Sequence, residues 1–496
     1  MTREVDRRGV DAEAVAEEFE DPEAGPALPS AALTAHAGMP AAALARRRAR
    51  DGRREIWALS WPVMFSQVLL NAVSLIDIAM VGRLGSDAVA AVGYATQFFF
   101  LSQSVLFAVG FACVALMARA IGAGDPIRAR LAFAASLAVA GGAALVLVAA
   151  MLAAPGPMLR LLGAQPHIVD ASVPYLSLVI GSSAPLALSM TIESALRADR
   201  DTRTPMVVAT IVTAVKLGLN GLLIFGAMGL PRLELVGAGI ATLVSQLLGL
   251  ALFLIVLARA APHSPLALRP RDLARSRPMI PEVVRVALPS VGERLANNLA
   301  LLAYFRILSG FGTLAIAAYT VGVRLLSFSW IPGVALGTSA STLVGQALGA
   351  DDARGAERAG WRAMRLSILV AVVLGLPSAL LREPLARLFT DDPGLVAELS
   401  PFLLCLALVQ PALQAHFALG GAHRGAGDTW TPFVAATLGN WLLRVPLAAL
   451  FAYVLETEVL WIWIVIAADH VSRTLWLVIS FRRGAWRERL ATPVGT

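Results

Sequence analysis

Long apolar stretches fill this chain from Ile56 onward, and they limit its fold more than any other feature. Each is close to the roughly 20 residues with which an α-helix crosses a bilayer. Charged residues make up 15% of the chain against 57% hydrophobic ones, too little charge to keep a soluble surface of this size hydrated. The sequence predicts an all-α polytopic membrane protein with twelve spans, at residues 56–80, 90–118, 129–153, 170–195, 206–228, 237–259, 283–308, 314–346, 363–381, 396–420, 432–455 and 459–480.

Residue types and spacings exclude several other classes of protein. The net charge is +7, but the arginines stand between apolar runs instead of along a soluble face, so nucleic acid is not an expected partner. The chain has no Gly-x-x-x-x-Gly-Lys-[Ser/Thr] loop and no Cys/His cluster with metal-ligand spacing. We therefore expect neither an enzyme nor a cofactor. The expected partners are the lipid bilayer and a small organic molecule, with no obligate protein partner.

The charge of the connections predicts the orientation in the membrane. Connections after even-numbered spans are rich in arginine, whereas those after odd-numbered spans are poorer and mixed in sign. Because positive loops stay in the cytoplasm, we expect both termini there, in the plasma (inner) membrane of a bacterium. The predicted organisation is a disordered cytoplasmic tail at 1–54, an N-lobe at 55–260 (spans 1–6), a cytoplasmic linker at 261–281, a C-lobe at 282–482 (spans 7–12) and a cytoplasmic tail at 483–496.

An internal repeat without gaps relates the two halves of the chain. Its offset is 227 residues, as in Pro289 and Pro62 (289 − 62 = 227). Further pairs at this offset are Asn71/Asn298, Gly85/Gly312, Gly122/Gly349, Asp125/Asp352, Pro174/Pro401, Arg197/Arg424 and Pro205/Pro432. With six spans in each repeat, the lobes should be related by a pseudo-two-fold axis along the membrane normal, an arrangement suited to alternating access. The alternative is a static duplicated scaffold, and we favour a transporter.

The first span carries a polar stripe that ends in a carboxylate. Gln67, Asn71, Ser74 and Asp77 are spaced by four, three and three residues, which places them along one side of a helix. Asp77 is the only acid in the span, and its repeat mate is Tyr304 (304 − 77 = 227). A desolvated aspartate can exchange a proton, or bind Na⁺ together with neighbouring oxygens. The alternative role is an interfacial ion pair between Asp77 and Arg83.

Other charged residues inside the spans also need partners, because an isolated charge in the bilayer is costly. Lys216 and Arg444 stand at nearly equivalent places of the repeat (216 + 227 = 443), and Asn220 follows Lys216 by one turn. Asp469 and Arg473 form an i, i+4 pair in the last span, and Asp469 could also neutralise Arg444. We interpret Lys216, Arg444, Asp469 and Arg473 as an intramembrane charge network.

The remaining polar residues of the spans are candidates for a substrate cavity. Glu293 and Asn297 are four residues apart and share a helix face, although Glu293 beside Arg294 is also compatible with a buried pair. The predicted lining consists of Gln67, Ser74, Glu293, Asn297, Tyr304, Arg324, Gln410 and Gln414.

Short motifs after the first two spans resemble those of a known family. The segment Asp77 to Gly85 (DIAMVGRLG) and the following Ala90 to Gly93 (AAVG) are similar to the first half of the multidrug and toxic compound extrusion (MATE) transporters. The segment 121–125 (IGAGD) and its repeat at 348–352 (LGADD) share this resemblance, which covers residues 55–485. The loop motif of the major facilitator superfamily, another twelve-span class with parallel halves, is absent.

The resemblance implies export of organic, often cationic, compounds in exchange for H⁺ or Na⁺. In the NorM-like branch a first-span aspartate couples the cation to transport, and Asp77 stands at the matching position. Asp77, Asn71 and Asn220 form our candidate cation-coupling set. The chain departs from the family where Asn297 replaces the seventh-span glutamate and Leu413 the tenth-span aspartate.

In the fifth span, Lys216 and Asn220 stand where the DinF-like branch has Asn and Asp. These departures favour proton coupling through Asp77. The alternatives are a metabolite exporter and a lipid-linked flippase, whose more cationic cavity would use Lys216, Arg324 and Arg444.

Overall fold

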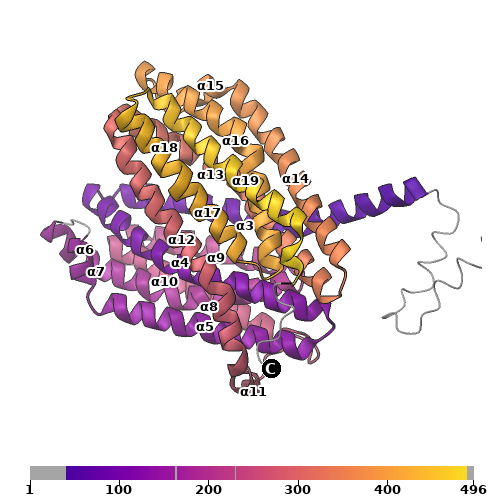
Figure 1. Ribbon diagram of the computed structural model, residues 1–496. Coiled ribbons are helices and arrows are strands. Elements are labelled where there is room, and N and C mark those ends of the chain that lie inside the picture. The colour runs from indigo at the N-terminus through magenta and orange to yellow at the C-terminus, as the bar shows by residue number, and fades with distance from the viewer. Residues whose placement is uncertain (1–40, 162–164, 230, 489–496) are drawn as a thin grey trace, which may run out of the picture. The chain divides into compact units, whose positions relative to one another are not determined.

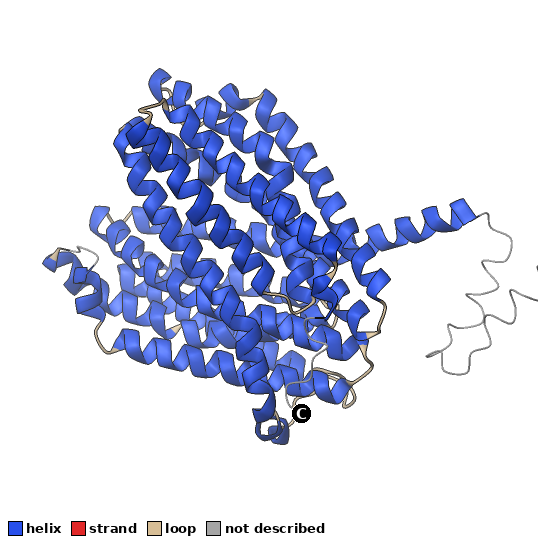
Figure 2. Ribbon diagram, viewed as in Figure 1, coloured by secondary structure: helices blue, strands red, loops and turns tan. Residues whose placement is uncertain are grey.

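The computed structural model describes residues 41–161, 165–229 and 231–488, and these ranges contain helices and short loops but no strand (Figure 2). The chain divides into two units, residues 1–52 and 53–496, and the membrane-crossing helices belong to the second. Residues 1–40 and 489–496, most of the two predicted tails, lie outside the described part. Helix α3 already begins at Ala41, inside the segment predicted to be disordered. Alanine and arginine, which dominate residues 41–54, are strong helix formers.

Seven long helices build the first half of the described part of the chain. The fourth predicted span is divided at Ser182 into α7 and α8, and the short α6 (Pro155–Leu161) precedes it. The seven are α3 (Ala41–Gly82), α4 (Ser86–Gly122), α5 (Pro126–Leu152), α7 (Pro166–Gly181), α8 (Ser183–Ala198), α9 (Arg203–Phe225) and α10 (Glu234–Ala258).

The second half repeats this order after the short linker helix α11 (Pro270–Arg275). Its eleventh span is irregular, because the π-helical turn η4 (Gly439–Arg444) and η5 (Leu450–Val454) interrupt the regular hydrogen bonding. The other helices are α12 (Ile280–Leu308), α13 (Thr313–Gly349), α14 (Ala353–Leu380), α15 (Arg382–Arg387), α16 (Pro393–Gly425), α17 (Trp430–Leu438), α18 (Val445–Ala449) and α19 (Val459–Arg483).

The helices are long and apolar enough for the predicted membrane fold. Ten helices of the described part qualify as spans by length and hydropathy, and α13 adds an eleventh with a bend of 45° between Leu325 and Ser327. The 29-residue α12, which carries Glu293 and Arg294, occupies the place of the remaining predicted span. The fold class predicted from the sequence is confirmed.

The repeat predicted from the sequence is visible in how corresponding helices begin. Asp125 caps α5, where its Oδ1 accepts hydrogen bonds from the backbone N–H of Ile127 (3.1 Å) and Arg128 (2.9 Å). Its repeat mate Asp352 (352 − 125 = 227) caps α14 by accepting from the N–H of Gly355 at 2.6 Å. A side-chain acceptor at this position satisfies N–H groups that the helix itself leaves unpaired.

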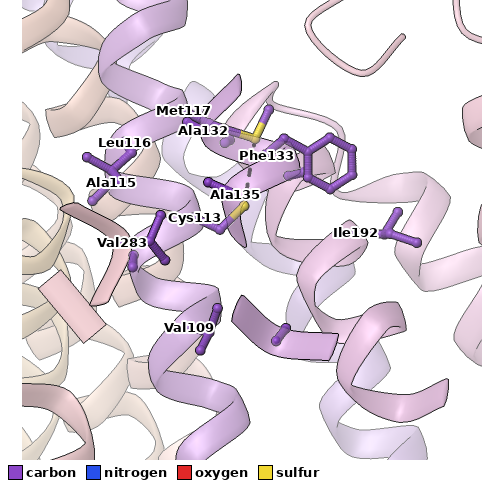
Figure 3. Packing of buried hydrophobic residues seen from close by; sticks show 14 of the residues in the cluster. Val109, Cys113, Ala115, Leu116, Met117, Ala132, Phe133, Ala135, Ile192 and Val283 are labelled. Carbon is purple, nitrogen blue, oxygen red and sulfur yellow. Dashed lines mark hydrogen bonds between the residues drawn. The ribbon is translucent and has the colours of Figure 1, made fainter. Parts of the chain in front are cut away.

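Each lobe contributes the beginning of its first helix to the core of the other lobe. Small and apolar residues of α4, α5 and α8 form the first core, which also contains Val283 of α12 (Figure 3). The second core, built mainly from α13, α14, α16 and α19, contains Ile56 and Leu59 of α3. Ile56 and Val283 are repeat mates (283 − 56 = 227), so the exchange is reciprocal.

Helices α4 and α13 cross at their C-terminal ends, and two glycines allow the contact. A Cβ atom at Gly122 would overlap the carbonyl oxygen of Gln346, and one at Gly349 would overlap that of Arg119. Nearby, the hydroxyls of Ser60 in α3 and Ser339 in α13 are 2.7 Å apart. The lobes therefore meet closely at this end of the helices. In Figure 1 the later helices α14, α16 and α19 lie together, coloured orange to yellow.

Candidate transport site

The carboxylate of Asp77 is held by two donors from α9. Lys216 donates to Oδ2 in an ion pair, and Asn220 Nδ2 donates to Oδ1 at 2.6 Å. The side chains of Asp77 and Lys216 are 22% and 23% exposed. Lys216 and Asn220 lie one turn apart on the same side of α9, so both can face α3. Each oxygen of the carboxylate thus has a partner inside the first lobe.

This geometry corrects two interpretations made from the sequence. Arg83, the alternative partner of Asp77, lies exposed after the end of α3. Lys216 was assigned to a network with Arg444, but its ammonium group pairs with Asp77 instead. Asp77 and Lys216 both belong to spans of the first lobe, and opposite charges inside a bilayer stabilise one another.

The rest of the polar stripe on α3 is arranged along the helix. Asn71 Nδ2 donates to the backbone carbonyl of Gln67, one turn back, at 2.8 Å. Gln67 and Asn71 are half-buried and Ser74 is exposed. On α9, Asn220 is 2% exposed, and its Oδ1 has no hydrogen-bond partner among the described residues. This oxygen is an available acceptor next to the carboxylate of Asp77.

A second charged cluster lies in the other lobe around Asp469 of α19. Arg473 Nε donates to Oδ1 at 2.6 Å and Arg473 Nη2 donates to Oδ2 at 2.8 Å. Arg444 Nη2 is 2.7 Å from Oδ2. Asp469 is fully buried and the side chain of Arg473 is 3% exposed. The approach depends on Gly439, where a Cβ atom would overlap Oδ1 of Asp469.

Two asparagines complete the hydrogen bonding of Arg473. Arg473 Nη2 donates to Asn440 Oδ1 at 2.5 Å, and Nη1 donates to Asn297 Oδ1 at 3.4 Å. Asn440 Nδ2 also donates to Asn297 Oδ1. Asn440 belongs to the π-helical turn η4, a distortion that is frequent at functional sites. The cluster therefore ties three helical segments together through one guanidinium group.

Glu293 pairs with an arginine other than its neighbour in sequence. Arg424 Nη2 donates to both carboxylate oxygens of Glu293, at 2.7 and 2.8 Å. The guanidinium of Arg424 also lies 4.8 Å from the ring centroid of Phe111, and that of Arg294 lies 4.6 Å from the ring centroid of Phe107. Both aromatic residues belong to α4, so these cations of the second lobe contact the first.

The other cavity candidates divide into buried and exposed residues. Gln410 Nε2 donates to Ser329 Oγ at 2.7 Å, and Gln414 donates to the backbone carbonyl of the same serine. These two contacts join α16 to α13 beside the bend of α13. Both glutamines are buried, whereas Arg324 is exposed. Tyr304 is fully buried and donates to the carbonyl of Ile462 at 3.1 Å. Within the described ranges, no three His, Cys, Asp or Glu residues are grouped to hold a metal.

Comparison with known proteins identifies the family. The MatE family model matches residues 62–222 and again residues 289–450. The two matches begin 227 residues apart (289 − 62 = 227), which is the offset of the internal repeat. The chain belongs to the MatE family. It is therefore a membrane transporter and not an enzyme, and the resemblance noted in the sequence is confirmed.

Curated relatives of this MatE protein cover almost its whole length. It is 28% identical over 445 residues to a protein named "Probable multidrug resistance protein NorM" from Thermotoga maritima, covering 88% of this chain and 94% of the relative. A protein of the same name from Bradyrhizobium diazoefficiens is 29% identical over 466 residues, covering 91% and 98%. A "FAD transporter" from Shewanella oneidensis is 28% identical over 407 residues, covering 81% and 88%.

Solved structures of MATE transporters share the fold. A mutant of the Vibrio cholerae transporter VcmN superposes with a TM-score of 0.81 at 20% identity, covering 88% of this chain and 97% of VcmN. A MOP superfamily transporter from Pyrococcus furiosus gives the same TM-score, identity and coverage.

Two residues of the MatE site were not recognised from the sequence as site residues. Asn440 joins Arg473 to Asn297, and its repeat mate is another polar residue, Thr213 (440 − 227 = 213). Arg424 was named only as the repeat mate of Arg197, which itself pairs with a glutamate, Glu193. The signal that could have found it was the repeat, in which an arginine recurs at the same helix end of both lobes.

Proposed function

We propose that this MatE transporter is a secondary active antiporter that exports amphipathic organic compounds in exchange for protons. The observation that supports it most directly is the contact of Asp77 with Lys216 and Asn220. The names of the NorM relatives support multidrug efflux. A carboxylate and an ammonium inside a lobe form a site whose net charge changes when one proton binds, as coupling to a pH gradient requires.

Lys216 favours the proton over Na⁺ as the coupling ion. A Na⁺ ion would need several oxygen ligands, and its access to Asp77 is opposed by the ammonium group already placed on Oδ2. A proton needs only one of the carboxylate oxygens. Protonation neutralises Asp77 and weakens its attraction to Lys216, so the tie between α3 and α9 loosens when the proton arrives.

Helix α3 offers a route from this site to the interface between the lobes. Asp77 lies near its C-terminal end, while Ile56 and Leu59 lie in the core of the second lobe and Ser60 contacts Ser339. A change in the contact between α3 and α9 therefore acts on a helix that both lobes share. From the loop charges we infer that the crossing of α4 and α13 lies on the cytoplasmic side, that the site opens outward in this conformation and that the lobes rock during transport.

The experiment is dye efflux from proteoliposomes driven by a pH gradient. Asp77→Asn should reduce rhodamine B efflux to background, because the amide cannot exchange a proton. Arg83→Gln is the matched control, since Arg83 is exposed and should leave efflux unchanged. Near-normal efflux by Asp77→Asn, at equal amounts of protein, would end the proposal.

Export of an anionic metabolite is the second candidate function. A relative carries the name "FAD transporter", and the second lobe has two arginines on one aspartate. The lipid-linked flippase receives less support, because Lys216 and Arg444 lie in different lobes and Lys216 is already neutralised by Asp77. Efflux of FAD compared with rhodamine B distinguishes the metabolite exporter from the drug exporter.

A further inference from the structure

Arg444 is a cation without a carboxylate of its own. Asp469 has one negative charge, and both of its oxygens already accept hydrogen bonds from Arg473 at 2.6 and 2.8 Å. This two-fold contact from a guanidinium is the strongest geometry that a carboxylate offers. Arg444 is a second cation on the same oxygen, Oδ2. The cluster of two arginines and one aspartate therefore keeps a net positive charge inside the lobe.

The repeat makes this imbalance specific to the second lobe. In the first lobe Lys216 faces Asp77, one cation against one anion. In the second lobe the mate of Asp77 is Tyr304 (304 − 77 = 227), and the guanidinium carbon of Arg444 lies 5.9 Å from the centroid of its ring. The hydroxyl of Tyr304 donates to the backbone carbonyl of Ile462. The carboxylate that balances the cation in one lobe is thus replaced by a neutral ring in the other.

Two N–H donors beside this charge lack acceptors in the described part of the chain. Arg444 Nη2 is 3.3 Å from His470 Nε2. Because arginine only donates, Nε2 of His470 must be the acceptor, so the proton of the neutral imidazole sits on Nδ1. That Nδ1 and the Nε of Arg444 are both buried and have no hydrogen-bond partner among the described residues. An anion is the ligand that would satisfy a positive site with free N–H donors.

We propose that Arg444 binds an oxyanion, a carboxylate or phosphate group carried by the exported compound. A guanidinium group can donate two parallel hydrogen bonds to two oxygens of either group. Arg444 is also the more accessible arginine of the cluster, with 13% of its side chain exposed against 3% for Arg473. The identification of the ligand as a transported compound rests on the proposed function; the anion site itself does not.

The test compares two dyes that differ in one charge. Rhodamine B has a free carboxylate, and its ethyl ester has the same rings without it. Fluorescence anisotropy of the full-length protein in detergent should show about tenfold tighter binding of rhodamine B, the effect of one charge-assisted hydrogen bond. Arg444→Gln should abolish this preference and leave binding of the ester unchanged. Inorganic phosphate should displace rhodamine B from wild type.

Controls separate this site from charge in general and from misfolding. Arg387→Gln removes an exposed arginine of the same lobe, in α15, and should retain the tenfold preference. Arg444→Lys should retain part of it, because the positive charge remains. Equal binding of the two dyes by wild type, or an unchanged preference in Arg444→Gln, would overturn the proposal. Neither result depends on a pH gradient, so failure of proton coupling would leave this measurement intact.

Discussion

At the scale of single residues, Lys216 sets the chemistry of the first lobe. Its ammonium group takes the position on Asp77 that a metal cation would need, and Asn220 supplies the second donor. The half-buried position of the pair lowers the local dielectric and strengthens the attraction. The lysine therefore acts as an internal cation that competes with Na⁺ for the carboxylate.

Replacing Lys216 tests this competition. In Lys216→Gln the carboxylate of Asp77 is free of the ammonium, and the unpartnered Oδ1 of Asn220 adds an oxygen ligand. We expect dye efflux by this variant to be stimulated by an inward Na⁺ gradient to which wild type does not respond. Efflux is measured with NaCl or choline chloride outside the vesicles. A Na⁺ response already present in wild type would contradict the assignment.

The two arginines on Asp469 should differ in their effect on stability. Arg473→Gln breaks a buried pair and leaves the Oδ1 of Asn440 without its donor, so we expect a loss of about 3 kcal/mol in the free energy of unfolding. Arg444→Gln removes the unbalanced charge and should change stability by less than about 1 kcal/mol. Denaturation of the purified variants in detergent measures both. Equal losses would show that Arg444 is structural.

At the scale of elements, the turn between α16 and α17 is held by Asp428. Its Oδ2 accepts from the hydroxyl of Thr431 at 2.6 Å and is 3.1 Å from His423 Nδ1, and the aspartate is 2% exposed. Burial opposes ionisation of Asp428, but the hydrogen bonds from His423 and Thr431 outweigh it and hold the pKa of its carboxyl below the ordinary 3.8. A lowered pKa means that the ionised form stabilises the fold.

Asp428→Asn should therefore destabilise the protein by about 1–3 kcal/mol near neutral pH. The contribution of Asp428 is complete above pH 3.8 and is lost as the pH falls through its lowered pKa. Thermal unfolding of wild type and variant across acid pH measures the difference, which should vanish at the acid end. The control is Asp201→Asn, at the repeat mate of Asp428. Its loss of stability should be smaller, because in the described contacts Asp201 accepts only from backbone N–H groups.

Most helices could be predicted from the sequence, because membrane-spanning helices are recognised by their length and hydropathy. The cap residues Asp125 and Asp352 follow from the repeat. The contact of Asp77 with Lys216 could not be predicted, because the spacing of residues along α3 does not indicate which side of α9 faces α3. The π-helical turn that contains Asn440 and Arg444 could not be predicted either, because its residue pattern does not differ from that of a regular helix.

At the scale of the whole molecule, the beginning of each lobe's first helix packs in the core of the other lobe. This exchange limits how the lobes can move during alternating access. Ile56 and Leu59 enter the second core, and Val283 enters the first. Each first helix therefore connects its own lobe with the other. We expect rocking of the lobes to move the beginning of α3 relative to α13 and so to break the contact between Ser60 and Ser339.

A disulfide at that contact should stop transport. In the double variant Ser60→Cys and Ser339→Cys, the sulfur atoms replace two hydroxyls that are 2.7 Å apart, so oxidation should join them with little change of backbone. We expect oxidised protein to lose dye efflux and to regain it on reduction. The single variants serve as controls for each substitution. Full efflux by the oxidised double variant would remove rocking of the lobes from the account.

The most direct test of the central claim is the movement of protons driven by the substrate itself. Proteoliposomes containing a trapped pH indicator receive an outward gradient of rhodamine B with no ion gradient. Wild type should acidify the lumen as protons enter in exchange for dye, with or without Na⁺, and Asp77→Asn should produce no change. Dye efflux by wild type without any change of internal pH, or a proton signal that persists in Asp77→Asn, would contradict proton exchange through Asp77.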